Sequence, residues 1–167
     1  SQPEKEVRNV KPNLDVRRNA WLNEAKRIVM ALVKRKELLS DACPEIADEE
    51  TQDANVKRAA EVNGQLNRLV ARLADLEKGP PLLGAASVLA KNHLDDVSRI
   101  VIAVLTLARL SHDLEDLVDR LDKLMLFVSG QNPVVALAVR DSLAPGGFLR
   151  PLVHTDPAKC HPWRDRR

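Results

Sequence analysis

The stretch DDVSRIVIAVLTLARLSHDLEDLVDRLDKLMLFV, residues 95–128, carries two different apolar patterns in succession. Residues 100–105 (IVIAVL) are apolar without interruption, which is typical of a helix surrounded by other helices. After residues 111–113 (SHD), apolar residues recur only every three or four positions, which indicates a helix with one face in water. Together the two patterns predict an all-α fold, a compact up-and-down helical bundle with a central member.

The rest of the chain extends this bundle in both directions. Apolar stripes, capping residues and Gly or Pro stops predict four main helices, over 13–40, 52–78, 83–110 and 113–128. We expect a turn at 111–113, because one helix over 95–128 would be about 50 Å long. The predicted organisation is a flexible leader (1–12), a helical bundle (13–129), a short accessory helix (130–143) and an extended Pro-rich tail (144–167).

Three features qualify the predicted packing. Arg18 and Arg35 occupy stripe positions where a coiled-coil seam would carry apolar groups, which favours a globular-bundle face. Gly64 lies in the middle of the second helix, where Gly costs about 1 kcal/mol relative to Ala, so we interpret it as a close helix crossing. The first helix is basic and residues 113–129 are acidic, so complementary rims favour them as neighbours.

Composition excludes several classes of function. Aromatic residues make up only 2% of the chain and Tyr is absent, so the stacking platforms of many nucleic-acid-binding modules are missing. The formal net charge is only +2, which argues against binding a polyanion. The longest nearly continuous apolar run, residues 100–108, is about half of what a membrane crossing needs. We therefore expect a cytoplasmic protein that neither binds nucleic acid nor inserts into a membrane.

The two cysteines, Cys43 and Cys160, allow two interpretations. A disulfide between them would tie the first interhelical loop to the tail, as in a small secreted bundle. Alternatively, both are unpaired thiols in a reducing cytosol. The sequence leaves both interpretations open.

Histidine–carboxylate pairs are the strongest candidates for metal chemistry. His93 with Asp96, and His112 with Glu115, share one helix face at a spacing of three residues. The His112–Asp113 dipeptide also resembles a hallmark of helical metal-dependent phosphohydrolases, a resemblance that would imply metal ligation and hydrolysis. Both pairs lie near predicted helix ends, however, where acidic residues serve as caps. We predict no catalytic residue, no metal site and no cofactor.

These observations favour a non-enzymatic adaptor or scaffold module that binds a protein partner through helix faces. In its aromatic-poor composition the chain resembles the helical bundles of cytoskeletal adaptor proteins of the vinculin and α-catenin type, without a diagnostic motif. Segment 134–139 follows a complete bundle, and the expected docking residues are Val134, Val135, Leu137 and Val139. The alternatives are a secreted four-helix-bundle signalling protein with a Cys43–Cys160 disulfide and, third, a helical metal-dependent hydrolase.

Overall fold

The computed structural model describes residues 2–41, 45, 48–78, 95–144, 147 and 149. All regular elements of this part of the chain are helices, which confirms the predicted all-α class. They are α1 (Gln2–Asp41), α2 (Glu49–Leu76), α4 (Asp96–Ala108), α5 (His112–Leu117), α6 (Leu121–Ser129) and α7 (Pro133–Leu143).

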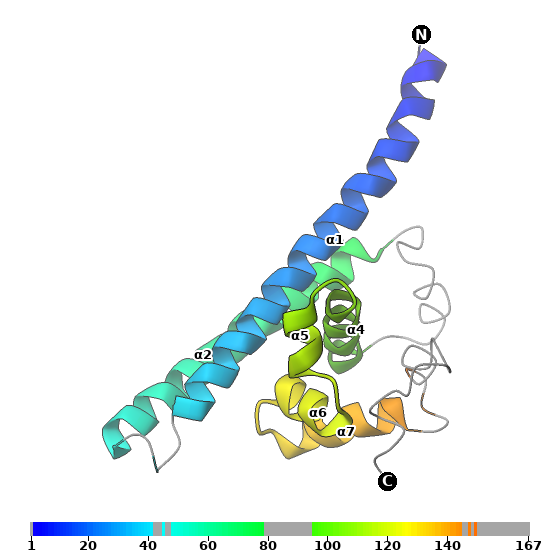
Figure 1. The fold of residues 1–167 in the computed structure, drawn as a ribbon. Helices are drawn as coiled ribbons and strands as arrows, with labels where there is room; N and C mark the ends of the chain where they lie inside the picture. The colour runs from blue at the N-terminus through cyan, green and yellow to red at the C-terminus, as the bar shows by residue number, and fades with distance from the viewer. Residues whose placement is uncertain are drawn as a thin grey trace.

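Helices α1 and α2 form a long antiparallel hairpin, and α4 to α7 pack against it as a compact group (Figure 1). The N-terminal turns of α1 project beyond all the other helices (Figure 1). Buried residues on the facing stripes recur at alternating steps of four and three, the spacing that keeps a helix seam turned toward its partner. They include Trp21, Ala25, Ile28 and Leu32 on α1 and Ala59, Val62, Leu66, Leu69 and Leu73 on α2.

Helix α4 is the central member that residues 100–105 predict. It begins at Asp96, and the part of the helix predicted over 83–94 lies outside the described residues. Val101, Ala103 and Val104 are completely buried. Asp95 begins the helix as its N-cap, because its side chain accepts a hydrogen bond from the N–H of Ser98 at 2.8 Å. Helix α4 contacts each of the other helices in the described part of the chain, and this explains why it is apolar on nearly all sides.

Helix α2 begins with a similar cap. The Asp48 side chain accepts a hydrogen bond from the Thr51 N–H at 2.8 Å. Hydrogen bonds from the Thr51 side chain and from its backbone N–H lower the pKa of the Asp48 carboxyl group, because they favour the ionised form. The predicted start at Gln52 is therefore a few residues late, since Glu49 and Glu50 already form the first turn.

The first helix is longer than the sequence predicts. We expected it to start at Asn13 or Asp15, after a flexible leader, but the helical backbone begins at Gln2. Pro3 lies in the first turn, where its missing N–H removes no intrahelical hydrogen bond. Residues 4–6 (EKE) are good helix formers, and the helix also continues through Pro12, although proline removes one intrahelical hydrogen bond.

The segment 113–128 is two helices, which corrects the prediction of one. The predicted turn is confirmed: α4 ends at Ala108, and the Ser111 hydroxyl caps α5 by accepting from the Leu114 N–H. However, α5 ends at Leu117 and α6 starts only at Leu121. The Lys123 ammonium group donates across this break to the Asp116 carbonyl at 3.1 Å. This bond satisfies a carbonyl near the C-terminal end of α5, a helix end that apolar periodicity does not predict.

The predicted accessory helix is confirmed as α7. The Asn132 side chain accepts hydrogen bonds from the N–H groups of Val134 and Val135, and Pro133 occupies the first turn. One part of the predicted extended tail belongs to the core instead. Leu149 is completely buried, and its N–H donates to the Ser142 carbonyl at 3.0 Å, so the chain folds back after α7.

Gly64 does not mark a helix crossing, which corrects the prediction made from its sequence position. A Cβ atom added at Gly64 would meet no atom within 4 Å. We expect Gly64→Ala to stabilise the protein by about 1 kcal/mol, because Ala restricts the unfolded chain without a steric cost. Urea denaturation of both proteins measures this change, and an unchanged or lower midpoint would contradict it.

Candidate functional site

The structure divides the four predicted docking residues between two faces of α7. Val134 and Leu137 are exposed, at 74% and 47% of their surface. Val135 is half-buried against the core, and Val139 is completely buried. Val139 therefore belongs to the core and not to an exposed docking surface, because its side of α7 packs onto the other helices.

Arg35 connects the long hairpin to α6. Its side chain is 5% exposed, and its guanidinium donates to the carbonyls of Phe127 and Val128, at 2.9 and 2.7 Å. A third bond, of 2.8 Å, reaches the Asn63 side-chain oxygen on α2. Burial lowers the pKa of Arg35, because desolvation disfavours its charge. In the sequence, Arg35 interrupts an apolar stripe. In the structure it is a buried cation at the C-terminus of α6, where the helix dipole favours positive charge.

Arg35 completes the hydrogen bonding at the end of α6. A helix leaves its last four carbonyls without intrahelical partners. The Leu126 carbonyl accepts from the Gly130 N–H, and the Ser129 carbonyl accepts from the Asn132 N–H. Arg35 takes the two carbonyls between them. All four groups therefore have a partner: two accept from backbone N–H groups close in the sequence, and two accept from the side chain of Arg35 on α1.

Gly130 makes this arrangement sterically possible. Its φ of +55° lies in the left-handed region, and a Cβ atom would collide with the Arg35 guanidinium group. We expect Gly130→Ala to destabilise the protein by about 1–3 kcal/mol, from the left-handed backbone and from displacement of Arg35. Chemical denaturation measures this loss, and Gly64→Ala is the matched control, because we expect the same Gly-to-Ala substitution to raise stability at that position. A stability equal to that of the parent would contradict the proposed close contact.

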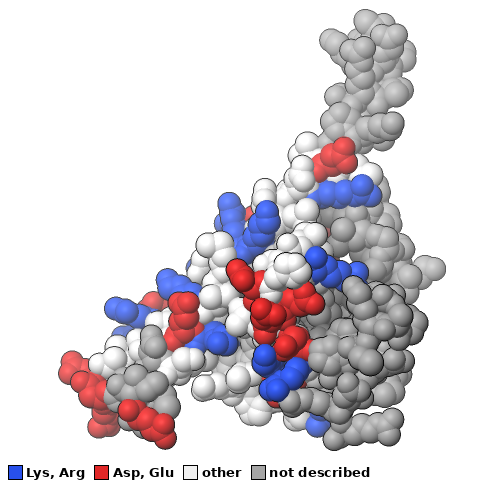
Figure 2. Space-filling model, in the orientation of Figure 1, with Lys and Arg blue, Asp and Glu red and all other residues white. Residues whose placement is uncertain are grey.

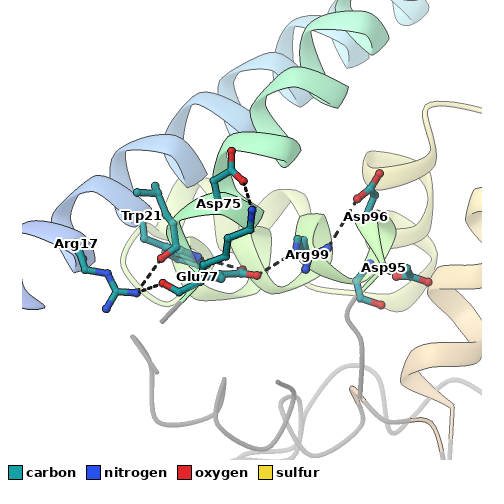
Figure 3. A network of polar contacts seen from close by, with 10 residues as sticks. Arg17, Trp21, Asp75, Glu77, Asp95, Asp96 and Arg99 are labelled. Atoms are coloured by element: carbon teal, nitrogen blue, oxygen red, sulfur yellow. Dashed lines mark hydrogen bonds and ion pairs between the residues drawn. The ribbon is translucent and has the colours of Figure 1, made fainter. Parts of the chain in front are cut away.

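A second polar junction joins α1, α2 and α4 at Glu77, just after α2 (Figure 3). One carboxylate oxygen accepts from the Trp21 indole N–H at 3.3 Å, and the other accepts from Arg99 Nε at 2.9 Å. Arg17 of α1 donates to the carbonyls of Leu76 and Lys78 at 3.1 and 2.8 Å. These bonds satisfy the C-terminal end of α2, so the junction fixes the relative positions of three helices.

Charge is distributed unevenly over the surface. Figure 2 shows acidic side chains gathered over α5, while Lys and Arg follow the two long helices. The ion pairs of α6 include Lys123–Asp119 at 2.9 Å and Arg120–Asp122 at 3.2 Å, both formed within one segment of the chain. Helix α1 does contact α6, as the complementary charges suggest, but through the buried Arg35.

Of the two candidate histidine–carboxylate pairs, only His112 with Glu115 lies wholly within the described residues. His112 is fully exposed, and its Nδ1 lies 3.5 Å from a Glu115 oxygen. Over the described ranges, no three His, Cys, Asp or Glu side chains come together in a group that could hold a metal ion. His93, Cys43 and Cys160 lie outside the described residues, so the proposed disulfide stays a prediction. Within the same limits, no helix is long and apolar enough to cross a membrane.

Sequence reasoning missed the roles of Arg35, Glu77 and Leu149. The only signal for Arg35 was a charged residue inside an apolar stripe. The same pattern occurs when such a side chain has a buried partner and when it extends its charged group to the surface. Chemically, both polar junctions bind helix ends of the protein itself, and α7 leaves the apolar side chains of Val134 and Leu137 in solvent. Comparison of the chain with protein-family models, with characterised proteins and with solved structures finds no match.

Proposed function

We propose that this protein is a non-enzymatic interaction module and that α7 is its docking element for a helix of a protein partner. The observation that carries the proposal is the exposure of Val134 and Leu137 on a helix that is otherwise anchored. Val139 and Leu143, on its other side, are completely buried. The exposed pair is separated by three residues, so both side chains lie on one helix face, which suits an apolar helical ligand.

The local structure of α7 favours binding. Its N-terminal turn is fixed by the Asn132 cap and by Pro133, so little conformational entropy remains to be lost on association. Full burial of a Val or Leu side chain contributes about 1.5–3 kcal/mol. Two such residues support a weak, reversible interaction, which suits an adaptor that exchanges partners.

The polar side chains support the same proposal. Arg35 and Glu77 are both engaged with helix ends and with neighbouring side chains of the protein itself. His112 is turned fully to solvent at the start of a short helix. Arg35 and Glu77 therefore stabilise the bundle, and the exposed pair on α7 remains as the apolar surface for recognition.

Site-specific photo-crosslinking tests the proposal. A photoreactive residue is placed at Leu137, in the full chain, and exposed to extract from the cells that express the protein. We expect a discrete crosslinked partner that a Val134→Ser substitution reduces by about tenfold, because lost apolar burial of this size weakens affinity by that factor.

The matched control is Met30→Ser, which also removes an exposed apolar side chain, 70% exposed on α1. This variant should retain the crosslinked partner. Equal loss in both variants, or crosslinking at Gln65 of α2 to the same partner, would exclude α7 as the docking element.

A further inference from the structure

Helix α5 is the least anchored helix of the compact group. Its six residues contact only α4 and α6 among the described elements. Leu114 is its one buried residue. Acidic side chains gather on the surface over this helix (Figure 2). A helix held by so few apolar contacts opens at a low free-energy cost compared with the core helices.

The break between α5 and α6 has no local cause in the sequence. Residues 118–120 (VDR) contain neither Gly nor Pro. Across the break, Leu114, Leu117, Leu121 and Leu124 keep the spacing of one continuous amphipathic helix. The backbone nevertheless leaves the helical region, with φ −131° and ψ 23° at Val118 and φ −129° and ψ 152° at Arg120.

The charges also suit a continuous helix. Asp116 with Arg120, and Asp119 with Lys123, are acid–base pairs at a spacing of four, with the acid N-terminal, which is the favourable order on a helix. In the broken arrangement, Arg120 is the N-cap of α6 but its side chain makes no capping hydrogen bond. Its Nε atom is buried and has no hydrogen-bond partner in the described part of the chain.

We propose that α5 is a lid on α4, which opens when residues 118–120 become helical and α5 and α6 merge into one helix over 112–129. The closed state is held by burial of Leu114 and Val118, which are 6% and 3% exposed, and by the Lys123 bond to the Asp116 carbonyl. The open state replaces that bond with the missing helical hydrogen bonds and keeps the Asp119–Lys123 pair. Opening uncovers the part of α4 beneath Leu114. This device is separate from docking at α7, and its test involves no partner.

Amide hydrogen exchange of the full chain, followed by NMR, distinguishes opening by merging from simple unfolding. Lys123 is in the first turn of α6, where N–H groups lie outside the hydrogen-bond ladder of the helix. In the merged helix its N–H gains the Asp119 carbonyl as acceptor. Leu114→Ala weakens the closed state, so we expect exchange of the Lys123 amide to slow about tenfold. Simple unfolding of α5 would leave that exchange equal or faster.

A locking variant supplies the second arm. Leu121 is the half-buried first residue of α6, a position where Pro is tolerated, and Arg120 already has the extended backbone that a residue before Pro adopts. Leu121→Pro is therefore compatible with the break but not with the merged helix. Adding it to Leu114→Ala should abolish the slowing at Lys123.

Glu115→Ala is the control, because Glu115 is an exposed residue of the same helix. It should leave Lys123 exchange at the parent rate. As an independent readout, the Cα chemical shift of Arg120 should move from the extended toward the helical range in Leu114→Ala alone. The proposal is overturned by unchanged or faster Lys123 exchange in Leu114→Ala, or by slowing that persists in the double variant.

Discussion

Replacement of Arg35 by Ala should destabilise the protein by about 2–4 kcal/mol, because it removes charge-assisted hydrogen bonds and leaves two buried helix carbonyls unsatisfied. The Phe127 and Val128 carbonyls and the Asn63 side chain lose their donor together. Relief of the desolvation cost of the guanidinium offsets part of this loss. Guanidinium chloride denaturation, followed by circular dichroism, measures the change.

Two variants make the Arg35 experiment specific. Arg35→Lys keeps the charge but not the planar fork, in which one nitrogen reaches both carbonyls and the other reaches Asn63, so its stability should lie between those of the parent and Arg35→Ala. Lys34→Ala removes an exposed cation from the same turn and should change stability by less than about 0.5 kcal/mol. If Arg35→Ala proved as stable as Lys34→Ala, the capping role of Arg35 would be wrong.

Gly130 and Arg35 should also be energetically coupled. The cost of Gly130→Ala comes partly from collision with the Arg35 guanidinium, which Arg35→Ala has already removed. The double variant should therefore lose less stability than the two single variants together, by about 0.5–2 kcal/mol. Additive effects would indicate that only the left-handed backbone of Gly130 matters.

Trp21→Ala should have the largest effect, a destabilisation of about 3–5 kcal/mol. Trp21 is 2% exposed between the long helices, so truncation leaves a large cavity and removes the indole N–H bond to Glu77. Trp21→Phe retains most of the apolar volume but not the N–H, and should lose only about 1 kcal/mol. Thermal and chemical denaturation of the two variants separate packing from the hydrogen bond.

The control for Trp21 is Val16→Ala, on the same helix. Val16 is 62% exposed, so its truncation should change stability by less than about 0.5 kcal/mol. If Trp21→Ala were as mild as Val16→Ala, the core assigned between α1 and α2 would be wrong.

Several features of the fold could be predicted because they depend on neighbouring residues. The uninterrupted apolar run at 100–105 predicted the central position of α4, and the sequence also predicted a short accessory helix within 130–143, which is α7. Apolar periodicity and end caps act within a few residues, so they are visible without a structure.

Other features depend on residues that the sequence separates widely. Periodicity over 113–128 predicted one helix, whereas contacts of α5 with α4 and of α6 with α7 accompany a break at 118–120. For the candidate docking site, the sequence predicted the segment that forms α7 but not which face of this helix is exposed to solvent. Val139 is buried and Val134 exposed because neighbouring helices cover one side of α7.

The sequence by itself therefore determined the helical class, the central apolar helix and the presence of a short helix after residue 130, since each follows from local spacing and from breaks in it. Only the tertiary structure decided that Arg35 is buried, that Gly64 faces open space and that α7 leaves Val134 and Leu137 in solvent. The physical reason is that burial and the hydrogen-bond partners of a charged side chain are set by packing between distant segments. A charged residue in an apolar stripe has the same local pattern whether it reaches water or the end of another helix.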